Sequence, residues 1–572
     1  MRLISVFCLI AGGAIAAPPE WVAASNRNAQ VLLEVEARLS PEGAGRLGMA
    51  GLDAKITDLS PGLEQRARAE YQKAKATLQT RLQEEKHPLI RQDLQILIEE
   101  ADRQIESIRL EEKYQLPYRN VIRMVYGGLS SLLDEQVEPG RRAAALERLR
   151  KYTGLESGYS PITKLAEQHT RSYFNRKELL GPPRAELEND LATAQTVIEG
   201  IGQLFEKYRI NGYQEPYARL KAQLNEYSDF LRKEMLPRSR TDFRLPSELY
   251  AFSLKTFGVD IPPQELAAKA HQSFTEIQGE MKIVAAKLAK ERGWANSDYR
   301  AVIRELKKEQ LTGQTILTHY RSRIKDLEAI IRREKLLTLP AREARMRLGT
   351  AAESAQSPAP HMRPPRLVGN TGEQGEFVLP LNVPGAGAYD DFTFAAASWT
   401  LTAHEARPGH ELQFAAMVER GVSQARAIFA FNSVNVEGWG LYSEWIAYPF
   451  MPLEGQLISL QHRLLRSARA FIDPELHMGK MTPEQAKRVL AEDVVVSPAM
   501  VKQETDRYMF RMPGQATSYF WGFVQLLALR RDVEKQMEGR FQAQAFHDFV
   551  LGEGLLPPSL LRKAVMQEFT KP

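Results

Sequence analysis

Long amphipathic helical segments make up most of this sequence, and they limit the folds that it can adopt. Between residues 63 and 116, apolar residues recur at intervals of three and four, as at Leu94, Leu97 and Ile98. This is the period of a helix with one buried face. Pro88 divides the run into two helices, because a proline disfavours helical backbone in the residue before it. Because similar segments cover residues 140–155, 183–235, 263–292 and 298–336, we expect a mainly α fold.

One short region has the pattern of β structure. Residues 376–382 form an apolar run between two stretches rich in glycine and proline, residues 368–372 and 384–387. Turn residues on both sides of a short apolar run predict strands. We expect a small β-hairpin or three-stranded sheet here, directly before the helix that carries the first motif described below.

The first residues have the composition of a secretory signal peptide. Arg2 precedes a short apolar run, and Ala14-Ile15-Ala16 fits a small-x-small cleavage site. The alternative is a frayed N-terminal helix. The apolar run is shorter than the ~20 residues that span a bilayer, and no later segment reaches that length without charges. We expect residues 1–16 to be removed, and the mature protein to be periplasmic or secreted, without stable membrane insertion.

Cysteine usage and charge exclude several classes of function. Cys8 is the only cysteine and lies in the expected signal peptide. The mature chain therefore has no disulfide, no thiolate metal ligand and no cysteine nucleophile. Any metal must be bound by His, Asp, Glu or backbone oxygen. The net charge is +5, from 76 basic and 71 acidic residues without a separate basic cluster, so nothing indicates nucleic-acid binding.

The segment from His404 to His410 is the most informative motif. It varies the H-E-x-x-H pattern, in which two imidazoles one helical turn apart bind zinc and the glutamate is the general base. Here Pro408 and Gly409 are inserted before the second histidine. Six positions along a regular helix would separate the two side chains by about 120°. Proline breaks the helix and glycine permits unusual backbone angles, so His410 can swing back toward His404. The alternative is a pair of unrelated packing histidines around a kink.

A second motif, residues 435–445, supplies carboxylates. Glu437 and Glu444 are seven residues apart, hence on one face of a helix that aromatic residues mark as buried. A buried carboxylate needs a partner, and a metal is one. Glu437 is the candidate for the third protein ligand of a catalytic zinc, with the fourth position left for water. The alternative for Glu437 is an arginine partner, and Glu444 fits a ligand or a supporting role equally well.

Candidates for transition-state stabilisation follow later in the chain. Tyr508 and Tyr519 carry hydroxyls that could stabilise an oxyanion, although ordinary buried tyrosines are the alternative. Arg507 and Gln515 lie beside them as candidates for substrate binding. His477 is four residues after a carboxylate that could orient its imidazole. That carboxylate is Asp473, with Arg466 and Arg469 on the preceding turns. A structural cluster is an equally good interpretation of Asp473 and His477.

Three ordered motifs resemble domain-of-unknown-function family 885. They are His404-Glu405-x-x-Pro408-Gly409-His410, Glu437-Gly438-Trp439-x-Leu441-Tyr442-x-Glu444 and Pro513-Gly514-Gln515-Ala516-x-x-Tyr519. This family resembles helical gluzincin peptidases such as thimet oligopeptidase and angiotensin-converting enzyme. The resemblance implies a large helical, two-lobed body with a central channel and one Zn²⁺ at its floor. The chain departs from those peptidases in the Pro-Gly insertion.

The resemblance also implies roles for individual residues. His404, His410 and Glu437 are expected to bind one Zn²⁺ per chain, with Glu405 as general base. Tyr519 or Tyr508, with His477, is expected to stabilise the oxyanion. A β-element beside the active-site helix pairs with the substrate backbone in such peptidases, and Phe377, Val378 and Leu379 hold that position here. Residues 17–340 are expected to form one wall of the channel, and residues 341–572 the catalytic region.

The sequence thus predicts a secreted zinc-dependent peptidase acting on oligopeptides. One alternative is a non-catalytic helical protein that binds peptides or envelope components. Another is a metal amidase that acts on peptidoglycan peptides. Endo- or exopeptidase action, residue preference and oligomeric state are left open by the sequence.

Overall fold

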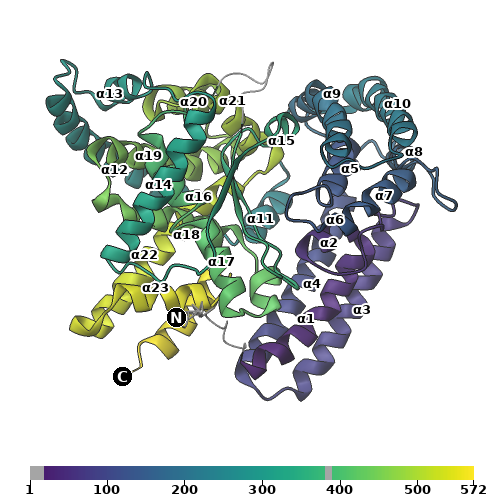
Figure 1. Cartoon of the computed structure of the whole chain (residues 1–572), viewed down its shortest axis with the longest axis horizontal. Helices are drawn as coiled ribbons and strands as arrows, with labels where there is room; N and C mark the ends of the chain where they lie inside the picture. The colour runs from purple at the N-terminus through teal and green to yellow at the C-terminus, as the bar shows by residue number, and fades with distance from the viewer. Residues whose placement is uncertain (1–18, 381–388, 572) are drawn as a thin grey trace, which may run out of the picture.

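A computed structural model of the chain describes residues 19–380 and 389–571. The expected signal peptide, residues 381–382 of the expected strand and the turn at 384–387 lie outside the described residues. The expectation of a mainly α fold is confirmed, because helices form most of the described chain and only three short strands interrupt them. Figure 1 shows the N-terminal helices, purple to blue, on one side of the molecule and the C-terminal helices, green to yellow, on the other.

The N-terminal helices follow the predicted pattern. The break expected at Pro88 separates α3 from α4, and Pro88 is the first residue of α4, where its missing N–H costs nothing. The bounds are α1 Glu20–Leu39, α2 Pro41–Leu47, α3 Leu63–Glu84, α4 Pro88–Tyr114, α5 Val121–Ser130, α6 Pro139–Arg142, α7 Ala144–Tyr152, α8 Ile162–Arg171, α9 Arg184–Lys207 and α10 Gln214–Phe230.

The remaining helices pack around more than one core, and one of these cores also includes residues of the N-terminal helices. The middle helices are α11 Ser247–Thr256, α12 Pro263–Arg292, α13 Tyr299–Leu306 and α14 Gln314–Arg333. The later ones are α15 Ala351–Gln356, α16 Ala397–Glu405, α17 His410–Arg420, α18 Ser433–Ala447, α19 Leu453–His477, α20 Pro483–Arg488, α21 Pro498–Asp506, α22 Ser518–Met537, α23 Ala543–Gly552 and α24 Pro558–Ala564. One cluster of buried apolar side chains runs from Phe243 to Trp521. The division at residue 340 stays a prediction, and the packing runs across it.

The small sheet has three strands in the order β1-β3-β2. They are β1 Arg345–Leu348, β2 His361–Arg363 and β3 Glu376–Leu379, with β3 parallel to β1 and antiparallel to β2. β3 is therefore central. Its side chains at Phe377, Val378 and Leu379 are buried. The expectation that these three residues pair with the backbone of a substrate is wrong, because their backbone is already paired within the sheet.

None of the helices in the described part of the chain has an apolar stretch long enough to cross a bilayer.

Two glycines let α18 and α22 pack with their backbones in contact. A Cβ on Gly522 of α22 would lie 2.0 Å from the carbonyl oxygen of Val434, and one on Gly438 of α18 would lie 2.6 Å from the carbonyl carbon of Gly522. No side chain fits at either position. The close approach holds α18 in place, and α18 carries both acidic candidates of the second motif.

We expect the substitution Gly522→Ala to destabilise the protein by about 1–3 kcal/mol, because the helices must separate to admit the methyl group. Thermal unfolding of the purified protein measures the change. Gly279→Ala on α12 is the matched control, since its new methyl group meets nothing within 4 Å. That change removes a helical glycine and should stabilise by about 0.5–1 kcal/mol. Equal unfolding temperatures for Gly522→Ala and the unmodified protein would contradict the requirement for backbone contact.

Candidate metal centre

The break in the first motif lies where the inserted residues predict it. α16 ends at Glu405 and α17 begins at His410, so the two histidines lie on different helices. The peptide bond between Arg407 and Pro408 is cis. The chain reverses between the two helices, and the imidazole rings of His404 and His410 meet edge to face with centroids 4.6 Å apart.

Gly409 is needed for space as well as for its backbone angles. Its φ is −76°, which any residue can adopt. A Cβ at this position would lie 1.8 Å from the carbonyl oxygen of His404. The expectation of unusual backbone angles at Gly409 is confirmed for ψ, which is −136°. The neighbouring Pro408 carbonyl accepts a hydrogen bond from the indole of Trp439 on α18, at 3.1 Å, which ties the break to that helix.

Buried charges fix the connection from the other side. Arg407 is almost fully buried and donates to Glu411 at 2.8 Å and to Glu328 on α14 at 2.6 Å. It also binds the carbonyl oxygen of Arg342. Pairing of this kind is required for a buried guanidinium, because an unpaired buried charge is costly. The loop between α16 and α17 is therefore held by three separate elements.

His404, His410 and Glu437 converge on one point. One donor atom from each lies within 4.8 Å of the other two. Oε2 of Glu437 is 3.4 Å from Nε2 of His404 and 3.3 Å from Nε2 of His410. This buried oxygen has no hydrogen bond among the described residues. Four donors arranged tetrahedrally about zinc at ~2.0–2.1 Å stand about 3.3–3.4 Å from one another. The spacing and the donor types therefore fit zinc.

Glu444 takes a supporting role, which resolves the alternative that the sequence leaves open. Its Oε1 lies 2.7 Å from Nδ1 of His404, and its other oxygen accepts from Thr400. This hydrogen bond fixes the proton of His404 on Nδ1, so Nε2 is left to face Glu437 and a metal. Gly440 makes the arrangement possible, because a Cβ there would lie 2.5 Å from Cε1 of His404.

The charges of the cluster depend on one another. Burial is the largest influence on His404 and lowers its pKa, but the carboxylates of Glu437 and Glu444 and other nearby negative charge together raise the pKa to about 9. Burial raises the pKa of Glu437, whereas the two histidines together bring it well below its usual range. Without a metal, the cluster therefore holds a proton that a divalent cation would displace.

A cavity of about 100 Å³ adjoins His404. Glu405 of α16 and Tyr519 of α22 both line it, as does Arg507. The ring of Tyr519 is parallel to that of His404, with centroids 6.2 Å apart, and its hydroxyl accepts a hydrogen bond from Arg507 at 3.0 Å. Three of the residues expected to act on a substrate thus surround one space beside the cluster.

Other candidates lie elsewhere. Tyr508 is fully buried, and its hydroxyl donates to Glu504 at 2.5 Å. Gln515 donates to Ser433 at 2.9 Å and accepts from Arg507. Neither side chain lines the cavity. The expectation that Tyr508 stabilises an oxyanion and Gln515 binds substrate is wrong, because both are committed to bonds within the protein.

His477 also has a structural role. Its Nδ1 accepts from the backbone of Leu245 at 3.3 Å, and its Nε2 donates to the carbonyl of Tyr508 at 3.0 Å. Burial lowers its pKa to about 4. The carboxylate expected to orient it, Asp473, instead accepts from Tyr250 and from the backbone of Gly514. The expected catalytic role of His477 is therefore corrected, since both ring nitrogens are occupied by backbone.

The sequence interpretation missed His462. This residue of α19 lines the cavity, and burial lowers its pKa to about 3. Its Nδ1 has no hydrogen bond within the described ranges. His462, Arg466 and Arg469 follow at i, i+4 and i+7, so one face of a single helix presents all three. That spacing is the signal that could have identified them.

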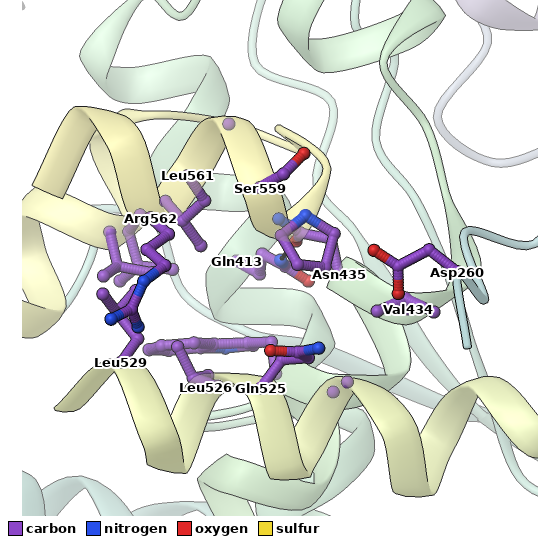
Figure 2. A pocket seen from close by; sticks show the side chains of 17 residues that line it. Asp260, Gln413, Val434, Asn435, Gln525, Leu526, Leu529, Ser559, Leu561 and Arg562 are labelled. Carbon is purple, nitrogen blue, oxygen red and sulfur yellow. Dashed lines mark hydrogen bonds between the residues drawn. The ribbon is translucent and has the colours of Figure 1, made fainter. Parts of the chain in front are cut away.

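A second cavity, of about 220 Å³, lies on another face of α18 (Figure 2). Leu526, Leu529 and Leu561 form much of its apolar wall, while the charged Asp260 and Arg562 are exposed. No histidine lines it among the described residues. It therefore has none of the chemistry of the cluster.

Comparison with known proteins identifies relatives that span the chain. A family model described as "Bacterial protein of unknown function (DUF885)" matches residues 41–565. No curated protein matches the sequence. Among solved structures, a "putative lipoprotein from Colwellia psychrerythraea" is 18% identical, with a TM-score of 0.76 over 95% of this chain and 99% of that one. A "putative lipoprotein of unknown function from Shewanella oneidensis" is also 18% identical, with a TM-score of 0.68 over 96% and 100%. These likenesses show a shared fold.

We expect the metal-free protein to lose stability as the pH rises from 6.5 to above 9. The folded-state pKa of His404 is about 9 against a usual 6.5, so its protonated form stabilises the fold fully below pH 6.5 and the contribution disappears as pH passes 9. The change amounts to at most about 3 kcal/mol. Thermal unfolding after chelation, measured across this range, tests it. His404→Gln should flatten the dependence, whereas the exposed His87→Gln should leave it intact. A flat profile in the unmodified protein would contradict the assignment.

Proposed function

The chain belongs to the DUF885 family of bacterial proteins, and on that premise we propose that it is a zinc-dependent peptidase acting outside the cytoplasm. One observation carries the proposal: two histidines and a glutamate from three helices converge beside a glutamate that faces a cavity. The donor set matches the His₂Glu ligands of catalytic zinc sites, which leave one position open. The likeness to gluzincin peptidases rests on the motifs alone.

His404, His410 and Glu437 would hold the zinc. When bound, zinc lowers the pKa of a coordinated water to about 7 and polarises a carbonyl oxygen. Glu444 would support zinc binding by His404, because its hydrogen bond to Nδ1 orients the ring and makes it a stronger ligand. The buried network thus fixes the ligands before a substrate arrives.

Glu405 would be the general base. It follows His404 directly and lines the same cavity, and no hydrogen bond or ion pair among the described residues occupies its carboxylate. A free carboxylate in this place can take a proton from the attacking water and deliver it to the leaving amine. Because of this proton transfer, the leaving group departs as a neutral amine and not as an amide anion.

Tyr519 is the candidate for stabilising the oxyanion. Burial raises the pKa of its hydroxyl, which therefore keeps its proton at neutral pH. Arg507 donates to the hydroxyl oxygen, so the hydroxyl hydrogen is available to point into the cavity. A positioned O–H donor stabilises negative charge as it develops on the carbonyl oxygen.

Two observations favour an exported protein. The first sixteen residues have the pattern of a signal peptide, and both structural relatives are described as lipoproteins. An oligopeptide is the proposed substrate, because the space where the cavity adjoins the metal cluster is small and largely buried.

We expect about one zinc per chain in the purified protein after dialysis, and much less in His410→Ala and Glu437→Ala, because each removes a ligand. Glu444→Gln should bind zinc about 10–100-fold more weakly while keeping the site. Elemental analysis and competition with a chelator measure both effects. His271→Gln, an exposed histidine of α12, is the control and should bind as the unmodified protein does. A metal-free protein that gains no zinc on titration would refute the proposed site.

We expect Glu405→Gln to keep its zinc and to hydrolyse peptides at least about 100-fold more slowly, since it loses the base but no ligand. Mass spectrometry of a mixed peptide library gives the rate and the cleaved bonds. Glu265→Gln, an exposed glutamate of α12, is the matched control. Unchanged turnover would remove Glu405 from this role, and zinc without any turnover in the unmodified protein would favour a peptide-binding protein.

A further inference from the structure

Buried polar atoms without partners gather on one wall of the cavity beside the metal cluster. They are Nδ1 of His462, Nε of Arg466 and Oε1 of Gln503, none of which has a hydrogen bond among the described residues. Most buried polar groups in proteins are hydrogen-bonded, so three orphans around one space indicate a missing ligand. The orphans include two groups that can donate and one that accepts.

The guanidinium groups of Arg466, Arg469 and Arg507 line this cavity. They differ in how completely a carboxylate neutralises them. Arg469 is neutralised by Glu504, which accepts two bonds of 2.7 Å from it. Arg507 is bonded to the neutral side chains of Gln515 and Tyr519 and stands 3.8 Å from Glu504. One carboxylate is thus shared by two cations.

Arg466 is the least satisfied of the three. Only 6% of it is exposed. Its nearest carboxylate oxygen, on Glu444, is 3.5 Å away, and that oxygen already binds His404 at 2.7 Å. Its one hydrogen bond is to the backbone carbonyl of His462 at 3.2 Å. A buried guanidinium with so weak a counter-ion is a strong site for an incoming anion.

The remaining acids on the cavity wall do not supply that anion. Asp391 is bound to Lys307 at 2.7 Å and to Ser497. Glu405 follows His404, at the end of the cavity where the metal cluster lies. The wall formed by α19 therefore keeps an excess of positive charge.

We propose that Arg466, with Arg507 beside it, binds the free C-terminal carboxylate of a peptide, so that the enzyme removes one or two residues from the C-terminal end. This inference rests on the proposed function. A carboxylate pairs with a guanidinium through two parallel hydrogen bonds. Oε1 of Gln503 is free to accept the backbone N–H of the same substrate residue. The same carboxylate oxygen of Glu444 lies 3.5 Å from Nη2 of Arg466 and 2.7 Å from Nδ1 of His404, so a short piece of substrate spans the distance between carboxylate and scissile bond.

The test compares two substrates on the zinc-loaded full chain: an N-acetylated tetrapeptide with a free C-terminus and the same peptide as its C-terminal amide. The free acid should be cleaved with a kcat/KM at least about 100-fold higher, because the site rejects a ligand that leaves its buried charge unpaired. Mass spectrometry should show release of one or two C-terminal residues. Equal rates for acid and amide, or cleavage only at internal bonds of longer peptides, would overturn the inference and leave the peptidase proposal standing.

The variant Arg466→Lys keeps the positive charge but loses the two-pronged contact. Its preference for the acid, measured as the ratio of kcat/KM for the acid to that for the amide, should fall at least tenfold, mainly through the KM of the acid. If Arg466 had a purely structural role, the variant would lower kcat/KM equally for both substrates. That result would also overturn the inference. Arg463→Lys is the matched control: Arg463 is half-buried on the same helix, pairs with Glu280 and does not line the cavity. It should keep the preference of the unmodified protein.

If no hydrolysis is found, peptide binding distinguishes the proposed carboxylate site from the proposed peptidase activity. Calorimetric titration of the zinc-loaded Glu405→Gln variant with both tetrapeptides measures recognition without turnover. Tighter binding of the acid than of the amide would support the carboxylate site even where the peptidase activity fails. Equal binding of the two peptides would overturn the site.

Discussion

Two glycines without side chains let three helices pack closely around His404, and the candidate site depends on this close packing. Gly409 has no room for a Cβ against the carbonyl of His404, and Gly440 has none against its ring. α16, α17 and α18 therefore approach more closely than side chains would permit. The close approach of Gly438 and Gly522 holds α18 against α22 in the same way. Steric space at glycines builds the cluster.

Once the helices are in place, electrostatics determines what the space can do. Glu444 binds Nδ1 of His404, and Glu437 lies near Nε2 of the same ring and near Nε2 of His410. An oxygen and two ring nitrogens face one another at distances longer than hydrogen bonds, which suits a cation better than a proton. The same helix that supplies both glutamates thus provides a candidate ligand and a carboxylate that holds His404, seven residues apart.

The interior beyond the cluster is unusually rich in cations. Arg469 is buried with a full counter-ion, Arg507 with part of one and Arg466 with less still. Burying charges costs free energy unless they are paired. A fold that retains an incompletely paired guanidinium beside a candidate catalytic site holds it ready for a negatively charged ligand.

The sequence by itself determined the helical class, the break at Pro408 and the identity of the three converging residues. Those signals are local: periodicity, a proline that stops a helix and the short spacing of chemically matched side chains. It placed a strand at residues 376–382 and expected Phe377, Val378 and Leu379 to pair with a substrate, whereas β3 pairs with β1 and β2, because strand order depends on partners elsewhere in the chain. Tertiary structure alone decided that His477 and Tyr508 are committed to bonds within the protein, while His462 and Arg466 face the cavity. Their roles follow from which helices pack together, and helix periodicity carries no information about the neighbour that each face meets.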